Sequence, residues 1–429
     1  MTLSLQKSFE LLDRAKKVVP AQTHTFSKGF YSFVEGQYPV FAESAKGSKF
    51  YDVDGNEFID YMAALGPIIL GYSNDSVNDA IKVQLEKGSI FSLPHRLEVE
   101  SAELMCEVTP DCDMAKVTKT GSDAVTAAVR ASRAITGKNN IAYWGGGGVW
   151  HDWFTVTTSR NKGIPKSLRD MVKFFEYNDI ESLKQILDND KEIGTVCMEP
   201  MMFDYPDNDF LNQVKKVTHD HDALLIFDEV QTGFRWALGG AQEKFNVSSD
   251  LSAWGKGMAN GMPLGSVSGK SEFMNIFEDI FYSTTFGGET LSLAAFNATV
   301  TELKENHVLP SIHKKGVKFQ EEFKKLTTDI GISIPIDGHP AKIRLQFLDE
   351  TGNESLLLRS LFCQENIQNG IFLWQGPIFH NYSHSDDDST KTLDSIEKSL
   401  KILKNSIESN NVEKMLKGKS MNRVMHFPI

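Results

Sequence analysis

The sequence has 429 residues, of which 41% are hydrophobic and 24% charged, a composition typical of a folded protein with a large core. Its formal net charge of −12 argues against a nucleic-acid-binding surface, which requires a basic stripe. The same charge fits a cytoplasmic protein, which is the expected location. The sequence has no run of about 20 apolar residues, so no membrane-spanning helix is expected.

The four cysteines, Cys106, Cys112, Cys197 and Cys363, form no Cys-x-x-Cys motif. We therefore expect reduced, mostly buried thiols and neither a disulfide framework nor a metal site.

The first part of the chain predicts short elements. Residues 1–20 have charges within an apolar pattern and favour an amphipathic helix over a signal peptide. Residues 20–47 look irregular. Residues 49–61 then predict two short strands joined at Asp54-Gly55, a strong hairpin signal, and a helix is expected from about Asn74.

From about residue 98 to 300, apolar runs alternate with helical patterns. The predicted strands are 115–120, 140–144, 193–200, 223–230, 250–256 and 263–269, and helices between them include 122–135, 180–189 and 209–221. Because strands that alternate with helices form a mainly parallel sheet covered on both faces, an α/β domain is expected here.

From about residue 310 the pattern changes to that of a smaller α+β domain. It predicts a long charged helix at 311–328, a strand at 342–349, and helices near 355–369 and 390–408. The expected organisation is an N-terminal segment (1–65) that contributes to the small domain and to the substrate site, a large domain (66–310) and a C-terminal small domain (311–429).

Three polar signals follow predicted strands, at the edge of an open α/β sheet where ligands bind. Residues Thr120–Asp123 place a glycine and hydroxyls at a helix N-terminus, which suits a phosphate or a simple helix cap. Asp228 ends an apolar strand, where it needs a partner such as a pyridinium N–H or the guanidinium of Arg235. Lys256 precedes a glycine-rich stretch and is either a Schiff-base nucleophile or a surface lysine.

Together the three signals supply a phosphate cradle, a partner for a ring nitrogen and an amine, which are the groups that pyridoxal phosphate (PLP) requires of a protein. The chain in fact resembles the fold type I PLP enzymes of aminotransferase class III, and within them the glutamate-1-semialdehyde 2,1-aminomutase branch. The segments that carry the resemblance are KFYDVDGNEFIDYMAALGPIILGYSNDSV, TGSDAVTAAVRASRAITGK, CMEP, LLIFDEVQTGFR, WGKGMANGMPLG, STTFGGETLSLAA and GIFLWQ…HSDDD.

The resemblance implies a large domain with a mainly parallel seven-stranded sheet, a smaller α+β domain, and PLP that alternates with pyridoxamine phosphate. It also implies a homodimer with shared active sites. By this resemblance, Lys256 attaches the cofactor and transfers a proton, and Asp228 pairs with the ring nitrogen. Val230 and Gln231 contact the ring, and Gly121 and Ser122 bind the phosphate. Thr285 binds the phosphate of the partner subunit's cofactor, and Glu199 and Arg235 support the site.

The segment 144–154 departs from the family pattern, which usually has an aromatic residue and a histidine here. Alignment on WHDWF places Gly147 and Gly148 at those positions, so Trp150 or another ring stacks on the cofactor, or one face of it stays uncovered. The four consecutive glycines, 145–148, also raise the alternative of a dinucleotide-binding loop. The Gly-x-Gly-x-x-Gly pattern is not met, because its last glycine would fall on Trp150 or on His151.

A second departure concerns the substrate. The aminomutase branch carries an arginine that pairs with the substrate carboxylate, and the matching position here is Lys28, which lacks the bidentate fork. His24 lies nearby in the sequence and either faces the site or is an ordinary loop residue.

The sequence thus predicts a PLP-dependent transaminase that transfers an amino group to a ketone or aldehyde, such as a keto sugar, a sugar acid or a semialdehyde. An intramolecular 2,1-aminomutase is the alternative that uses the same residues. A binding protein without catalysis is a third hypothesis, and the presence of both Asp228 and Lys256 argues against it.

Overall fold

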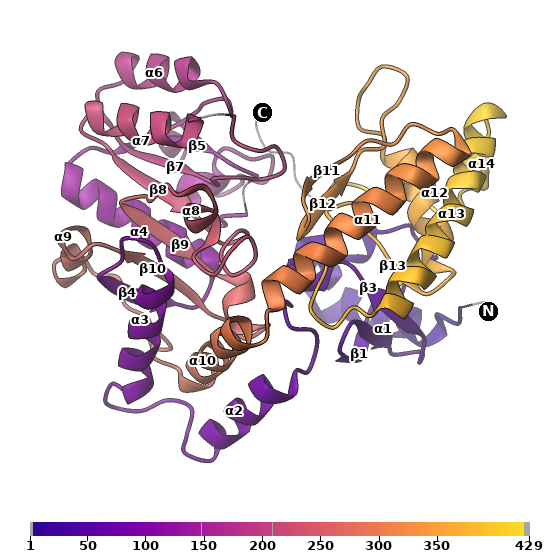
Figure 1. Ribbon diagram of the computed structural model, residues 1–429, viewed down its shortest axis with the longest axis horizontal. Helices are drawn as coiled ribbons and strands as arrows, with labels where there is room; N and C mark the ends of the chain where they lie inside the picture. The colour runs from indigo at the N-terminus through magenta and orange to yellow at the C-terminus, as the bar shows by residue number, and fades with distance from the viewer. Residues whose placement is uncertain (1–2, 147, 208, 424–429) are drawn as a thin grey trace. The chain divides into compact units, whose positions relative to one another are not determined.

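A computed structural model describes residues 3–146, 148–207 and 209–423. The chain divides into two compact units (Figure 1). Unit 1 combines the N-terminal segment to Leu65 and residues 69–74 with the chain from Pro310 onward, and unit 2 contains residues 66–68 and 75–309. Within the described residues, no helix is both long enough and apolar enough to span a membrane.

Unit 2 contains the seven-stranded sheet. Its strands are β4 (Met114–Thr118), β5 (Asn140–Trp144), β6 (Val172–Phe174), β7 (Ile193–Met198), β8 (Leu224–Asp228), β9 (Leu251–Trp254) and β10 (Gly265–Gly269), in the spatial order β4-β10-β9-β8-β7-β5-β6. Neighbouring strands pair in parallel, except that β10 runs antiparallel to both β4 and β9. The predicted α/β fold with a mainly parallel seven-stranded sheet is therefore confirmed.

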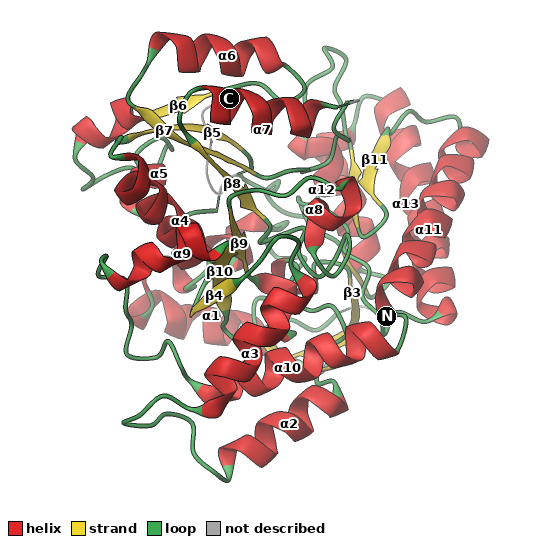
Figure 2. Ribbon diagram, turned by 60° about the vertical axis from the view of Figure 1, so that its left-hand side comes forward, coloured by secondary structure: helices red, strands yellow, loops and turns green. Residues whose placement is uncertain are grey.

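Helices cover both faces of this sheet (Figure 2). The helices of unit 2 are α2 (Asp75–Leu85), α3 (Arg96–Val108), α4 (Gly121–Thr136), α5 (Asp152–Thr155), α6 (Ile180–Asn189), α7 (Phe210–Asp220), α8 (Gly240–Phe245), α9 (Ser271–Met274) and α10 (Thr290–Glu305). Adjacent residues of a strand point to opposite faces, so Ile226 packs in the cluster with α4 while Leu225 and Phe227 pack with α6 and α7. Burial of both faces explains why β8 is almost continuously apolar.

Unit 1 is built around two small sheets and a group of helices. Its strands are β1 (Ala42–Lys46), β2 (Lys49–Asp52), β3 (Glu57–Asp60), β11 (Ile336–His339), β12 (Lys342–Leu345) and β13 (Ile371–Phe372), and its helices are α1 (Gln6–Val18), α11 (Val308–Ile330, which belongs to this unit from Pro310), α12 (Leu356–Ile367), α13 (Asp386–Glu408) and α14 (Val412–Met415). The predicted hairpin is present as β2 and β3, and β13 adds to it in parallel.

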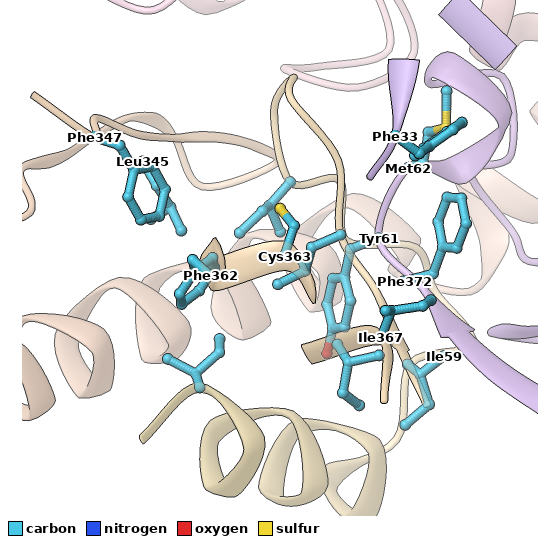
Figure 3. Packing of buried hydrophobic residues seen from close by; sticks show 14 of the residues in the cluster. Phe33, Ile59, Tyr61, Met62, Leu345, Phe347, Phe362, Cys363, Ile367 and Phe372 are labelled. Atoms are coloured by element: carbon cyan, nitrogen blue, oxygen red, sulfur yellow. The ribbon is translucent and has the colours of Figure 1, made fainter. Parts of the chain in front are cut away.

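An aromatic-rich core packs the elements of unit 1 together (Figure 3). The ring of Phe372, in β13, packs against two other aromatic rings. Its centroid lies 5.0 Å from that of Phe50 and 5.3 Å from that of Phe33. Such pairs stabilise by roughly 0.5–1.5 kcal/mol beyond the area they bury. The core therefore ties residues near the start of the chain to residues more than 300 positions later.

Candidate active site

The ends of three strands bring the predicted polar signals to one edge of the sheet. β8 and β9 are parallel neighbours, and Asp228 at the end of β8 pairs with Ala253 of β9. Since β10 is antiparallel to both β4 and β9, β4 points the same way as β9. The segments after β4, β8 and β9 therefore leave the sheet at a common edge, as expected for an α/β ligand site.

The N-terminus of α4 forms the candidate anion site. Thr120 and Asp123 form a reciprocal cap, in which the Thr120 hydroxyl accepts from the Asp123 amide at 3.1 Å and the Asp123 carboxylate accepts from the Thr120 amide at 2.8 Å. The helix cap considered from the sequence is thus real, but it uses Thr120 and Asp123. The amides of Gly121 and Ser122, in the first turn, belong to the positive end of the helix dipole and suit an anion.

Ser122 is joined to a segment that sequence reasoning did not connect with it. Its hydroxyl oxygen accepts from the backbone N–H of Trp150 at 2.8 Å and lies 3.0 Å from Nδ1 of His151. Burial lowers the pKa of His151, and the charge of Asp123, whose Oδ1 lies 3.6 Å from Nε2, opposes this shift. His151 is therefore a further candidate residue of the anion site, which only the tertiary contact reveals.

Trp150 was predicted as a possible ring that stacks on the cofactor. It is 62% exposed, and its ring stacks on that of His151 with centroids 4.1 Å apart. Gly148 has a φ of +113°, a backbone conformation that favours glycine, while Gly147 lies outside the described residues. Trp150 thus lies beside the residues around Ser122 and presents much of its surface to solvent.

Asp228 is 6% exposed and accepts a hydrogen bond of 3.0 Å from the Val230 amide. Burial, and next the charge of Glu199, raise its pKa to about 7, while Lys256 opposes the shift. Glu199 follows β7, is 4% exposed and accepts from the Gly146 amide at 2.7 Å. The site therefore brings together two buried carboxyl groups, and their mutual effect favours the protonated form of Asp228.

Lys256 follows β9 after one intervening residue, Gly255, and burial lowers the pKa of its amine. The charges of Asp228 and Glu199 oppose this shift, while Arg235 adds to it. The residue has a φ of +44°, which costs a non-glycine residue energy and occurs preferentially at functional sites. A lysine with a lowered pKa is a better nucleophile near neutral pH.

Close backbone packing holds the lysine against the anion site. A Cβ atom placed on Gly255 would lie 3.2 Å from the Cα of Gly121, and one placed on Gly121 would lie 2.6 Å from both γ carbons of Val230. Small residues are therefore required where the segments after β4, β8 and β9 meet.

The residues at this edge fit PLP. The helix N-terminus suits its phosphate, buried Asp228 suits its protonated ring nitrogen, and Lys256 suits its aldehyde. In addition, the side-chain oxygen of Gln231 is buried without a hydrogen-bond partner among the described residues, so a polar group of a ligand would satisfy it.

Arg235 contributes to the surroundings of the lysine. It is 1% exposed, donates to the carbonyl oxygen of Gly66 at 2.6 Å, and has its pKa lowered to about 9 by burial. Its charge also lowers the pKa of Lys256. No group of three or more His, Cys, Asp or Glu side chains that could hold a metal ion occurs in the described part of the chain.

The remaining predicted residues belong to other segments of the chain. Thr285 is exposed in a loop of unit 2, between the exposed rings of Phe281 and Phe286. His24 and Lys28 belong to unit 1, where both are exposed.

Lys28 lines a pocket of about 420 Å³ within unit 1, together with Asp60, Tyr72 and apolar residues. Although the residue as a whole is exposed, neighbouring atoms partly desolvate its amine and lower the pKa of Lys28, and the charge of Asp60 opposes this shift. Lys28 is thus next to a carboxylate within its own unit.

Comparisons with known proteins give a consistent result. Residues 30–374 match the family model for class III aminotransferases. The chain is 36% identical to the 3-aminobutyryl-CoA aminotransferase of Cloacimonas acidaminovorans (strain Evry), over 93% of this chain and 97% of that protein. It is 33% identical to the glutamate-1-semialdehyde 2,1-aminomutase of Archaeoglobus fulgidus, over 93% of this chain and all of that protein.

The fold agrees with these matches. The PLP internal aldimine form of the FumI protein of Sphingopyxis sp. MTA144 superimposes with a TM-score of 0.89 at 25% identity, covering 94% of this chain and 98% of that one. Residues 30–374 make up most of the 429-residue chain, and the relatives match over nearly their whole length. The protein therefore belongs to the class III aminotransferases, a family of PLP-dependent transaminases and aminomutases.

Proposed function

We propose that this protein is a PLP-dependent aminotransferase that moves an amino group from an amino donor to a ketone or aldehyde acceptor. The observation that carries the proposal is that Asp228 and Lys256 lie at the ends of adjacent parallel strands and act electrostatically on one another, while burial shifts their pKa values in opposite directions. Such opposed shifts in one buried place are typical of catalytic acid–base groups.

In this proposal each residue has a distinct task. Gly121 and Ser122 bind the cofactor phosphate at the N-terminus of α4, with the His151 ring beside the Ser122 hydroxyl. Asp228 keeps the ring nitrogen protonated, Val230 contacts the ring, and Gln231 meets a polar ring substituent with its unsatisfied oxygen. When bound, PLP supplies an electron sink for the substrate carbon.

Lys256 holds the cofactor by its amine and, when released, carries a proton between the substrate carbon and the cofactor. Its lowered pKa favours the neutral amine that can accept this proton near neutral pH. The charge of Glu199 raises the pKa values of both Asp228 and Lys256, and the charge of Arg235 lowers the pKa of Lys256.

The experiment begins with purified holoenzyme reduced by borohydride and digested. The cofactor label should appear on the peptide that contains Lys256, and Lys256→Ala should carry none. Amino donors, including 3-aminobutyryl-CoA because of the relative named for it, are then screened for loss of the cofactor's absorption. Acceptors such as keto sugars, sugar acids and semialdehydes are tested on the pyridoxamine form. A label on another lysine, or full activity of Lys256→Ala, would overturn the proposal.

A second candidate is an intramolecular 2,1-aminomutase, which the full-length match to glutamate-1-semialdehyde aminomutases favours. The two activities separate in a steady-state assay. A transaminase needs a second substrate and releases a keto product, whereas an aminomutase converts one substrate without a donor.

Lys28 and His24 are the proposed substrate residues. Support comes from the position of Lys28 in the aminomutase-like N-terminal segment and from its place on the unit 1 pocket. Asp60 lines the same pocket, and its negative charge cancels part of the positive charge of Lys28. Lys28 would therefore attract a substrate carboxylate less strongly than an isolated lysine. This favours acceptors that depend less on a carboxylate than glutamate semialdehyde does.

The proposed unit is a homodimer in which Thr285 binds the phosphate of the partner's cofactor. Support comes from the exposed loop that carries Thr285, where Phe281 is 86% and Phe286 57% exposed. Apolar rings so exposed on a folded surface are typical of protein interfaces.

A further inference from the structure

Two cysteines outside the candidate active site lie side by side in unit 2. Cys106 is in the last turn of α3, Cys112 is in the turn that leads to β4, and their Sγ atoms are 2.7 Å apart. Both residues are partly exposed, whereas Cys197 and Cys363 are 0% and 1% exposed. The expectation of mostly buried thiols therefore holds for only two of the four.

The turn between the two cysteines is held at both ends. The Thr109 amide donates to the Met105 carbonyl oxygen at 3.1 Å, which closes the end of α3. After the turn, the Asp113 amide donates to the Gly269 carbonyl oxygen at 3.0 Å, and the Asp113 carboxylate accepts from the Ser271 amide at 3.0 Å. These hydrogen bonds fix the backbone on both sides of the turn and hold the two sulfur atoms 2.7 Å apart. A disulfide bond of about 2.05 Å therefore requires the sulfur atoms to approach by less than about 1 Å.

The two thiols have different roles in the contact. The Cys112 thiol donates to Cys106, and this hydrogen bond lowers the pKa of Cys106, while burial and the charge of Asp113 oppose the shift. The pKa of Cys112 is raised, first by the same hydrogen bond and then by burial. Cys106 is therefore the first of the pair to become a thiolate, the form that attacks disulfides.

We propose that Cys106 and Cys112 are a reversible modification site that forms an intrachain disulfide by exchange with a low-molecular-mass disulfide. The Cys106 thiolate attacks one sulfur of that disulfide, which breaks its S–S bond and releases one thiolate. The Cys112 thiol then loses its proton and attacks Cys106, which forms the protein disulfide and releases the second thiolate. Two protein thiols are oxidised and one small disulfide is reduced to two thiols.

The test uses the full-length holoenzyme in mixtures of oxidised and reduced glutathione. After acid quenching and alkylation, trypsin cleavage at Arg96 and Lys116 yields one peptide with both cysteines. We expect this peptide to lose two alkylation sites and the mass of two hydrogens as the mixture becomes oxidising. The ratio of cross-linked to reduced peptide should change tenfold for each ~30 mV, as for a two-electron couple.

Cys106→Ser and Cys112→Ser are matched variants that each keep one thiol of the pair. Each should form only a mixed disulfide with glutathione, and neither should gain the thermal stabilisation of a few degrees that the oxidised wild type gains from its closed loop. Cys197 and Cys363 serve as internal controls, which should stay protected in the folded protein. Two mixed disulfides on the wild-type peptide, or full alkylation at the most oxidising ratio, would overturn the proposal.

Discussion

At the scale of single residues, the site depends on how burial acts on charge. Burial raises the pKa of Asp228 and lowers that of Lys256, because both lose hydration that favours their charged forms. A bound ring with a protonated nitrogen would add positive charge beside Asp228 and favour its ionised form. The cofactor-free protein should therefore carry a measurable electrostatic penalty at this carboxyl.

This penalty predicts a pH-dependent stability. The pKa of Asp228 is about 7 in the fold and about 4 in an unfolded chain, so its contribution is fully present below pH ~4 and is lost as the pH rises to 7. A pKa difference of about three units corresponds to at most about 4 kcal/mol of unfolding free energy. Cofactor-free Asp228→Asn should therefore lose less stability than the wild type between pH 5 and pH 8.

The measurement is urea unfolding of both cofactor-free proteins at the two pH values. Burial raises the pKa of Glu229 to about 7 and that of Asp60 to about 6. These two groups leave the variant with part of the pH dependence of its unfolding free energy. Asp79→Asn, at a carboxylate that is 67% exposed, is the control and should behave as the wild type. Parallel curves for Asp228→Asn and the wild type would contradict the prediction.

The backbone of Lys256 predicts an unusual ranking of two inactive variants. At a φ of +44°, a residue with a Cβ is strained by roughly 1–2 kcal/mol, and glycine is not. Lys256→Gly should therefore be more stable than Lys256→Ala by about 1 kcal/mol without cofactor, the reverse of the usual order. Thermal unfolding of the two variants decides this, and an equally stable Ala variant would show that the backbone relaxes.

The sequence was informative about residues that end strands and silent about contacts made in space. Asp228 and Lys256 could be placed at the sheet edge because each follows an apolar strand. The approach of His151 to Ser122, and of Cys112 to Cys106, depends on how a turn or a distant loop folds back. No spacing rule encodes such contacts.

At the scale of elements, the site depends on the packing of the α4 N-terminus against the segments after β8 and β9. A methyl group on Gly121 would lie 2.6 Å from both γ carbons of Val230. Gly121→Ala should therefore destabilise the cofactor-free protein by about 1–3 kcal/mol and weaken PLP binding.

Two further variants make this prediction specific. Gly257→Ala is the steric control, since its added carbon would have its nearest neighbour at 3.8 Å. Val230→Ala removes the clashing atoms, so the double variant with Gly121→Ala should be more stable than the sum of the single effects predicts. Strict additivity in the double-mutant cycle would mean that Val230 is not the obstacle.

The elements themselves were largely predictable where burial is complete. Strands such as β5 and β7 begin at the predicted residues because both faces are covered and the apolar run is continuous. The three-residue edge strand β6 and the exposed strand β1 were missed, since neither has a buried pattern. The composition of β10 does not indicate that it runs antiparallel to its neighbours. The segment between β9 and β10 is nevertheless too short for the helical crossover that a parallel pair requires.

At the scale of the whole molecule, unit 2 exposes apolar side chains on two loops that meet. The Thr290 amide, after the loop of Phe281 and Phe286, donates to the Ser89 carbonyl oxygen at 2.9 Å, and Leu93 on the second loop is 78% exposed. Burial of these side chains against a second copy of the chain would remove them from water. Light scattering of the purified protein should accordingly give the mass of a dimer.

If Thr285 serves the partner's site, two defective proteins should repair each other. A Lys256→Ala subunit lacks its own amine but can lend an intact Thr285 to a Thr285→Ala subunit, which keeps Lys256. After random exchange of subunits at equal amounts, half of the dimers are mixed and each has one complete site, so about a quarter of wild-type activity should return. The assay is run at a PLP concentration that leaves Thr285→Ala alone nearly inactive. If Thr285 instead serves its own subunit, the mixed dimer has no complete site and mixing restores nothing, even though light scattering still reports a dimer.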